Sequence, residues 1–199
     1  MSLSTIGAPP SVDDLIVDAA EDCFRLAGAR HTTIDDIAAA AGISRATVYR
    51  RLGNRDRVVL AVLVRITERH LGRLRPRLLA QPDLESALAL LVRATVTAAR
   101  QDDLRLLFAS EERGASGAPI PGALEPLAAR FGAVVTSLAD RFPGQLDGAV
   151  DEREAGEWLL RAMLSLATFE AEPARSVAAT DRWVRRFVLP GILADTAAR

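Results

Sequence analysis

Apolar side chains recur at intervals of three and four residues along the first part of the chain. From Leu15 onward they form one helical stripe, which ends at Gly28. Ser11 followed three residues later by Asp14 is the pattern of an N-terminal helix cap, in which each side chain bonds the other residue's backbone amide. The pattern predicts a first helix that begins after Ser11 and ends near Gly28.

Two shorter stripes follow, and a glycine separates them. Thr33 with Asp36 repeats the capping pattern, and the first stripe ends at Gly42, a residue that tolerates the left-handed backbone of a helix C-terminus. Ser44 is a second N-cap, and Val48 anchors the second helix inward, so that most of its other side chains point outward. Two short helices joined by a tight turn are the arrangement of a helix-turn-helix motif.

The rest of the chain predicts further helices. Asn54 can cap a long helix that we expect to reach Leu74, before Pro76 disrupts it. Helical stripes also cover residues 84–100, 104–113, 124–142, 152–169 and 180–197, with breaks rich in Gly, Pro or polar residues between them. Nothing alternates with the period of two that marks a strand, so the sequence predicts an all-α protein.

This pattern divides the chain into three parts. Residues 1–10 are a loose tail, residues 11–53 form a three-helix head, and residues 54–199 form a helical body. With 199 residues, 49% of them hydrophobic, the chain can bury a packed core. The single cysteine, Cys23, fits a reducing compartment. Because we find neither a membrane span nor a secretory leader, we expect a cytoplasmic protein.

Positive charge is concentrated on the second short helix. Residues 43–57 hold five arginines and one acidic residue, although the formal net charge of the chain is −1. Guanidinium groups bind phosphates and guanine edges, hydroxyl groups bond phosphate oxygens, and a short helix fits the major groove of DNA. The cluster therefore indicates a nucleic-acid interface. The alternatives are a solvated basic helix and a head that pairs with another protein, which would more often present aliphatic side chains.

The run Gly-Ile-Ser-Arg-Ala-Thr-Val-Tyr-Arg-Arg-Leu-Gly-Asn-Arg at residues 42–55 resembles the signature of the tetracycline-repressor (TetR) family of bacterial transcription regulators. The resemblance extends from Asp13 to about Leu63, and it departs at Leu52, often Phe in the family, and at Arg55, often Lys. It implies that the phosphate contacts come from Thr33, Ser44, Tyr49, Arg51 and Arg55. It also implies that Arg45, Ala46, Thr47 and Arg50 face base edges.

The body contains no pattern of catalytic or metal-binding residues. Its acid pairs, such as Asp102 with Asp103, are adjacent and point to different sectors of a helix. We therefore predict no enzymatic activity, no cofactor and no metal. Polar side chains inside apolar helices indicate a mostly apolar ligand cavity, although core threonines that bond their own helix explain them equally well. The predicted lining residues are Leu91, Thr95, Phe108, Phe131, Thr136 and Met163.

The last two predicted helices carry more apolar surface than one core needs. A two-fold interface of four helices accounts for it, and the alternative is a larger core within one chain. The resemblance implies the same homodimer. The predicted interface residues are Ala162, Leu166, Trp183, Val184, Phe187 and Gly191. The sequence therefore predicts a homodimeric, ligand-responsive regulator that binds an inverted-repeat operator in double-stranded DNA, most simply a repressor released by a small apolar molecule. A helical ligand-binding or protein-interaction module that does not bind DNA is the alternative.

Overall fold

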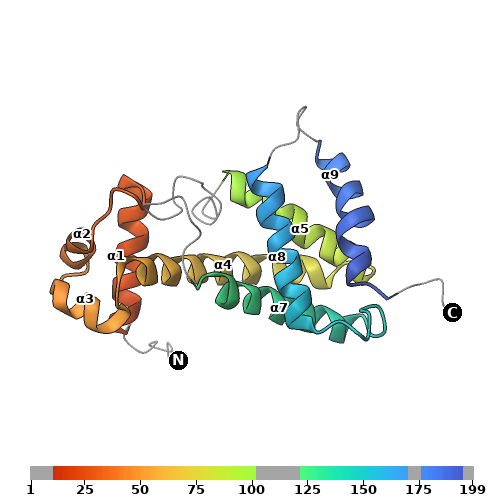
Figure 1. Ribbon diagram of the computed structural model, residues 1–199, viewed down its shortest axis with the longest axis horizontal. Helices are drawn as coiled ribbons and strands as arrows, with labels where there is room; N and C mark the ends of the chain where they lie inside the picture. Colours follow the sequence, from red (N-terminus) through yellow and green to blue (C-terminus); the bar gives the residue numbers. More distant parts are fainter. Residues whose placement is uncertain (1–10, 102–121, 170–175, 195–199) are drawn as a thin grey trace, which may run out of the picture. The chain divides into compact units, whose positions relative to one another are not determined.

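The computed structural model describes residues 11–101, 122–169 and 176–194, and these ranges fold into helices joined by short connections (Figure 1). The helices are α1 (Val12–Ala27), α2 (Ile34–Ala40), α3 (Arg45–Leu52), α4 (Arg55–Leu79), α5 (Leu84–Gln101), α7 (Leu124–Arg141), α8 (Glu152–Thr168) and α9 (Val177–Trp183). Within these ranges the only β-type pairing is an isolated antiparallel bridge between Leu146 and Leu193. The predicted all-α fold is confirmed.

The chain divides into two compact units, Met1–Val62 and Leu63–Arg199. In the first unit α1, α2 and α3 contact one another, and Ile16, Ile37 and Val48 are completely buried between them. These three side chains come from three different helices, so burying them holds the three helices together as one head. The functional boundary after residue 53 stays a prediction.

Local hydrogen bonds determine where the first helix begins and ends. The Ser11 hydroxyl accepts from the Asp14 N–H at 3.1 Å, and the Ser11 N–H donates to Asp14 Oδ2 at 3.1 Å. At the other end Gly28 has a φ of 81°, a conformation that costs residues with a side chain more than glycine. Both ends of α1 therefore lie where the sequence predicts them.

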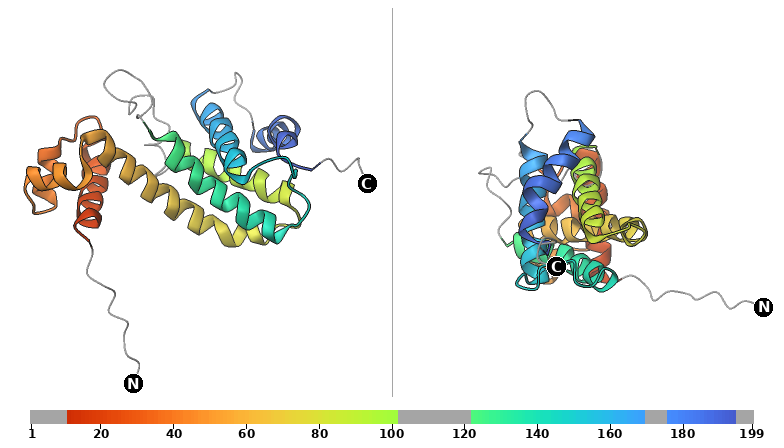
Figure 2. Two further views of the ribbon diagram at one scale, coloured as in Figure 1. Left: turned by 60° about the horizontal axis from the view of Figure 1, so that its bottom comes forward. Right: turned by 90° about the vertical axis from the view of Figure 1, so that its right-hand side faces the viewer.

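In the second unit α5 is the central helix. It contacts α7, α8 and α9, and Figure 2 shows it between α9 and the part of α4 that belongs to this unit. Leu84, Leu88, Leu91 and Val92 of α5 are completely buried. Four such side chains at helical spacing account for the position of α5 at the middle of the body.

The helices α7 and α8 form the closest pair in the body, because two glycines meet where they cross. A Cβ atom added to Gly156 would lie 2.3 Å from the backbone N of Gly132 and 2.7 Å from the carbonyl oxygen of Ala128. Both obstacles are backbone atoms, which cannot rotate away as a side chain can. The approach of α7 to α8 therefore depends on the missing side chain at position 156.

The helix α4 does not end before Pro76 as predicted, but continues through it to Leu79. Proline removes the N–H that would bond the carbonyl of Gly72, yet this loss falls in the last two turns of a 25-residue helix. Leu78 is completely buried beyond the proline, and the Ala80 N–H bonds the Pro76 carbonyl at 3.2 Å. Burial of the last turn outweighs the lost hydrogen bond.

The C-terminal helix also differs from the prediction of one helix over residues 180–197. It begins earlier, at Val177, and after Trp183 it continues as a π-helical turn, Val184–Val188, and a 3-10 turn, Leu189–Gly191. The Leu189 N–H bonds the Val184 carbonyl, and Pro190 has no N–H with which to continue an α-helix. The helix predicted at residues 104–113 lies outside the described residues.

Candidate nucleic-acid interface

Hydrogen bonds on both sides of the turn between α2 and α3 fix how α3 is presented. The Thr33 hydroxyl accepts from the Asp36 N–H at 3.2 Å, and the Thr33 N–H donates to Asp36 Oδ2 at 2.8 Å. The N–H of Thr33, and then its hydroxyl, lower the pKa of Asp36 by stabilising the carboxylate. Gly42 turns the chain with a φ of 67°, and the Ser44 hydroxyl accepts from the Thr47 N–H at 3.2 Å to begin α3. The predicted caps and glycine turn are confirmed.

One side of α3 is buried and the other is open to solvent. Val48 is completely buried and Leu52 is half-buried, so these two residues anchor the helix to the head. The exposed side chains are Arg45, Ala46, Tyr49, Arg50 and Arg51, and Thr47 is half-buried beside them. The predicted outward direction of this helix face is confirmed, while the contacts of each residue with DNA stay predictions.

The Arg45 side chain is held by one acid and one aromatic residue. Its Nη1 lies 3.0 Å from Asp35 Oδ2, its Nη2 donates to the Tyr49 hydroxyl at 3.3 Å, and its guanidinium carbon lies 5.4 Å from the centre of the Tyr49 ring. The hydrogen bond to Tyr49, and then the charge of Asp35, raise the pKa of Arg45. Ion pairs between exposed groups are weak, so these contacts orient Arg45 without preventing its exchange onto DNA.

The Arg51 side chain forms a two-pronged ion pair with Asp13 of α1. Its Nε donates to Asp13 Oδ1 at 2.7 Å, and its Nη2 donates to Asp13 Oδ2 at 3.0 Å. Both side chains are close to half exposed, so solvent weakens the pair. A phosphate offers the same paired oxygens as the carboxylate, and the predicted phosphate contact of Arg51 therefore requires an exchange of one partner for the other.

Arg55 has a structural role that the sequence does not indicate. Its Nε donates to the Thr32 carbonyl at 3.3 Å, and its Nη2 donates to the Ala29 carbonyl. These bonds join the start of α4 to the loop before α2, and the side chain is half-buried. Its predicted phosphate contact, like that of the exposed Thr33, stays a prediction.

Sequence reasoning missed the acidic partners of the α3 arginines. Asp13 precedes Arg51 by 38 residues and Asp35 precedes Arg45 by 10, so neither pair follows a helical spacing. The acids do carry a local signal, because each follows the N-cap of its own helix by two residues, where negative charge is favoured. That signal explains why acidic residues occupy these two positions, but it does not predict which arginines they pair with.

The structure places four of the predicted ligand-binding residues in the interior of the body. Leu91, Thr95, Phe131 and Met163 are buried there, and their contacts with a ligand stay predictions. Thr95 bonds His70 Nε2 at 3.1 Å inside this core. Thr136 is exposed, and its hydroxyl bonds the Gly132 carbonyl of its own helix at 3.1 Å. Phe108 lies outside the described residues.

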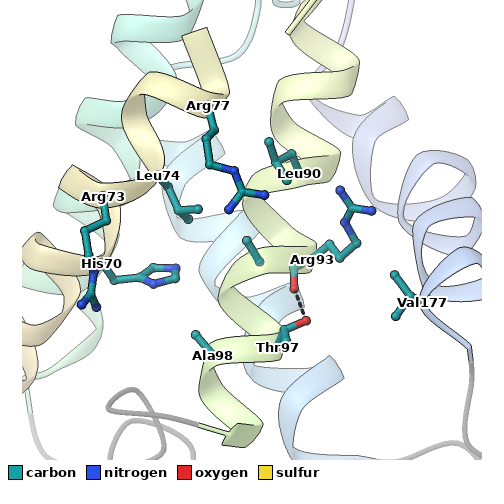
Figure 3. A pocket seen from close by; sticks show the side chains of 10 residues that line it. His70, Arg73, Leu74, Arg77, Leu90, Arg93, Thr97, Ala98 and Val177 are labelled. Atoms are coloured by element: carbon teal, nitrogen blue, oxygen red, sulfur yellow. Dashed lines mark hydrogen bonds between the residues drawn. The ribbon is translucent and has the colours of Figure 1, made fainter. Parts of the chain in front are cut away.

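A hollow of about 750 Å³ lies elsewhere in the body, beside α5 (Figure 3). Its lining includes Arg73 and Arg77 from α4 and Arg93 and Thr97 from α5, and we call it the arginine cavity. The Thr97 hydroxyl donates to the Arg93 carbonyl of its own helix at 2.9 Å. The charge of this lining differs from the mostly apolar cavity that the sequence predicts.

The predicted dimer residues fall into two groups. Leu166 and Val184 are buried in the core of the single chain, and their part in an interface stays a prediction. Phe187 and Gly191 are exposed, and Ala162 and Trp183 are half-buried. Phe187 is 58% exposed, and two further large apolar side chains nearby are also exposed, Trp158 at 44% and Val177 at 62%. The α8–α9 side of the body therefore keeps exposed apolar surface, including Trp158.

The structure gives little support for other kinds of site. In the described ranges no group of three or more His, Cys, Asp or Glu side chains is placed to hold a metal ion. Cys23 is half-buried, and burial, followed by the charges of Asp36 and Asp22, raises its thiol pKa and so disfavours the reactive thiolate. None of the helices that the structure describes is long and apolar enough to cross a membrane.

A three-helix head with a capped, arginine-rich and exposed third helix defines a helix-turn-helix protein. Comparison with known proteins agrees. Residues 16–62 match the family described as "Bacterial regulatory proteins, tetR family". An uncharacterized HTH-type transcriptional regulator of Mycobacterium tuberculosis (strain CDC 1551 / Oshkosh) is 34% identical over 187 residues, which cover 93% of this chain and 87% of the relative.

Solved structures show the same fold along most of the chain. The TetR family repressor AlkX from Dietzia sp., implicated in biodegradation of n-alkanes, has a TM-score of 0.62 and 21% identity, covering 92% of this chain and 98% of its own. The regulator FadR from Bacillus subtilis, in complex with stearoyl-CoA, has a TM-score of 0.55 and 16% identity, covering 89% and 98%. The chain belongs to the TetR family, and it is a DNA-binding transcriptional regulator rather than an enzyme.

Proposed function

We propose that the protein is a homodimeric repressor that binds an inverted-repeat operator through α3 and leaves it when a small molecule binds the body. The observation that supports this most directly is the exposed face of α3. Arg45, Arg50 and Arg51 all reach solvent there, together with the Tyr49 ring and hydroxyl. A surface made of guanidinium and hydroxyl groups suits phosphate oxygens and base edges, and it is a poor surface for an aliphatic protein partner.

The individual contacts follow from where each side chain lies. Ser44 and Thr33 are exposed at helix N-termini, where their hydroxyls and the adjacent backbone amides suit phosphate oxygens. Arg45 and Ala46 occupy the first turn of α3, which is the part of a recognition helix that reaches base edges. Arg51 lies in the last turn and is better placed for the phosphate backbone. Arg45 therefore contributes to sequence choice and Arg51 to overall affinity.

Dimerisation would supply the second half of the operator contacts. One three-helix head offers few base contacts, and two-fold symmetry doubles them on an inverted repeat. The exposed Trp158 and Phe187 supply apolar surface that a partner protomer can cover. TetR-family regulators act as dimers, which agrees with this surface.

Ligand response is supported by the family and by the hollow in the body. The neighbour FadR from Bacillus subtilis was solved with stearoyl-CoA, so this fold can hold a large effector in that protein. In this chain the arginine cavity offers about 750 Å³ for an effector, and two of its arginines lie on α4. The arginine cavity is therefore the effector site that we propose, beside the buried residues whose ligand contacts stay predictions.

The test is a selection of bound fragments from the genomic DNA of the source organism, followed by a gel shift of the selected site at several salt concentrations. The proposal expects an inverted repeat, and it expects affinity that falls steeply with salt because phosphate contacts release counterions. Fragments without a shared repeat would overturn sequence-specific binding. No DNA retained at low salt would favour the alternative of an interaction module.

A further inference from the structure

The arginine cavity is lined by several positively charged side chains. Arg73, Arg77 and Arg93 line it together with His70, and none of the lining residues that the structure describes is acidic. No ion pair in the described part of the chain involves these three arginines. By contrast, Arg185 in the same unit contacts two acids, at 2.9 and 3.0 Å. The arginines of the cavity therefore differ from Arg185 in having no acidic partner in the described part of the chain.

The positions of these arginines bring like charges close together. Arg73 and Arg77 are four residues apart on α4, a spacing that places like charges on one face of a helix. Arg93 adds a third guanidinium from α5; in Figure 3 Arg77 reaches from α4 toward α5, and Arg93 points to the side of α5 where Val177 lies. An anion bound beside these guanidinium groups would relieve this repulsion, and each guanidinium can bond two of its oxygens.

The remainder of the lining is suited to apolar groups. Leu74 and Leu90 line the cavity and are otherwise buried, with 5% and 6% of their surfaces exposed. Ala94 and Ala98 are short side chains on the cavity side of α5, and they leave the space that a longer side chain would fill. One end of an occupant can therefore meet guanidinium groups while the rest lies against leucine and alanine.

We propose that the arginine cavity binds an anionic amphiphile. Its oxyanion head bonds Arg77 and Arg93, Arg73 adds positive charge at the edge of the cavity, and its apolar part lies against Leu74 and Leu90. Carboxylate and phosphate heads share this chemistry. The assignment of this ligand as the effector rests on the proposed function, whereas its binding to the cavity does not.

Binding of four probes with one tail length and different heads tests the charge preference in the full-length protein. Decanoate and decyl phosphate are the anions, decanol is the neutral probe and decyltrimethylammonium is the cation, each measured by calorimetric titration below its micelle concentration. We expect at least one anion to bind about tenfold or more tightly than decanol, since hydrogen bonds to charged groups are the strong ones. The better anion identifies the head. Equal binding of decanol or of the cation would overturn the proposal.

Paired substitutions locate the site. Arg77→Gln combined with Arg93→Gln should weaken the anion about tenfold or more and leave decanol unchanged, because only the head loses its partners. Arg75→Gln is the matched control: Arg75 lies on the same helix but bonds the Ser137 hydroxyl at 3.2 Å and does not line the cavity. Its anion affinity should stay within about twofold of wild type. Equal loss in both variants would move the site elsewhere.

Operator binding measured beside the titration separates the two proposals. Release of the operator by the anion supports both the site and its role as effector site. An anion that binds the cavity without changing operator affinity supports the site and overturns its regulatory role. Normal operator binding without any preference for anions overturns the site and leaves the proposed regulator standing.

Discussion

Replacing Gly156 with alanine should force α7 and α8 apart. The added Cβ would lie 2.3 Å from the backbone N and 2.7 Å from the Cα of Gly132, and 2.7 Å from the Ala128 carbonyl oxygen. Carbon atoms normally approach other heavy atoms to about 3.5–4.0 Å, so the helices must separate by roughly 1 Å or more. Because every obstacle is backbone, no rotation of a side chain can relieve the contact.

The size of the effect follows from two opposing terms. Overpacking a core costs about 1–3 kcal/mol in the free energy of unfolding, and a backbone obstacle places this site at about 3 kcal/mol. Alanine favours a helix over glycine by about 1 kcal/mol, which leaves a net loss of about 2 kcal/mol. For a chain of 199 residues this loss lowers the melting temperature by roughly 4–8 °C.

Gly72→Ala is the matched control for this prediction. Gly72 lies inside α4, it is exposed, and a Cβ added there meets no heavy atom within 4 Å. The same substitution should therefore stabilise the protein by about 0.5–1 kcal/mol, through helix propensity alone. Thermal unfolding followed by far-UV circular dichroism measures both variants, at one protein concentration because dimerisation makes the melting temperature depend on concentration. A Gly156→Ala protein as stable as wild type would refute the argument from close approach.

Three further predictions concern the head and the α8–α9 side of the body. In gel shifts, Arg51→Ala should weaken binding to operator and random DNA alike and reduce the salt dependence of binding. Arg45→Ala should instead lose about tenfold in preference at one base position of the operator. Equal loss of affinity for operator and random DNA in Arg45→Ala would contradict a base contact by Arg45. Phe187→Arg places charge on an exposed apolar side chain, so light scattering should find monomer with reduced operator affinity, and an intact dimer would move the interface elsewhere. The hydrogen bonds from Thr33 lower the pKa of Asp36 in the folded head, so the stability they give is present above the ordinary pKa of 3.8 and is lost as pH falls through the lower folded pKa. In urea unfolding at a series of acidic pH values, Asp36→Asn should reduce the fall in the free energy of unfolding with falling pH. An unchanged fall would exclude this linkage.

Local signals account for the parts of the fold that the sequence predicts correctly. The caps at Ser11, Thr33 and Ser44 are hydrogen bonds across three residues, so their chemistry can be read from neighbouring letters. The left-handed turn at Gly42 is equally local. These signals fix the helix-turn-helix, and with it the family and the direction in which α3 faces.

The parts that the sequence does not predict depend on contacts between distant residues. Pro76 alone indicates a break, and only the burial of Leu78 beyond it explains why α4 continues. Thr95 and Thr136 look alike as polar residues in apolar helices, yet one is buried against His70 and the other faces solvent. Which face of a body helix is covered depends on its neighbours, and a single stripe of apolar residues does not identify them.

The sequence does not predict the arginine cavity, because its lining comes from separate helices. Its composition determines how an effector could act. A ligand changes operator affinity only if it binds one of two arrangements of the protein better than the other. Arg73 and Arg77 lie on α4, which also contributes residues to the head unit, and Arg93 lies on α5. An anion bonded by both helices favours the spacing at which all its guanidinium partners reach it. A preference of about 1–3 kcal/mol changes operator affinity by roughly 5- to 150-fold, and by reciprocity the operator weakens the anion by the same factor. A ligand that contacted α5 alone would not favour one spacing of α4 and α5 over another. The arginines on α4 are therefore what would let binding in this cavity change operator affinity.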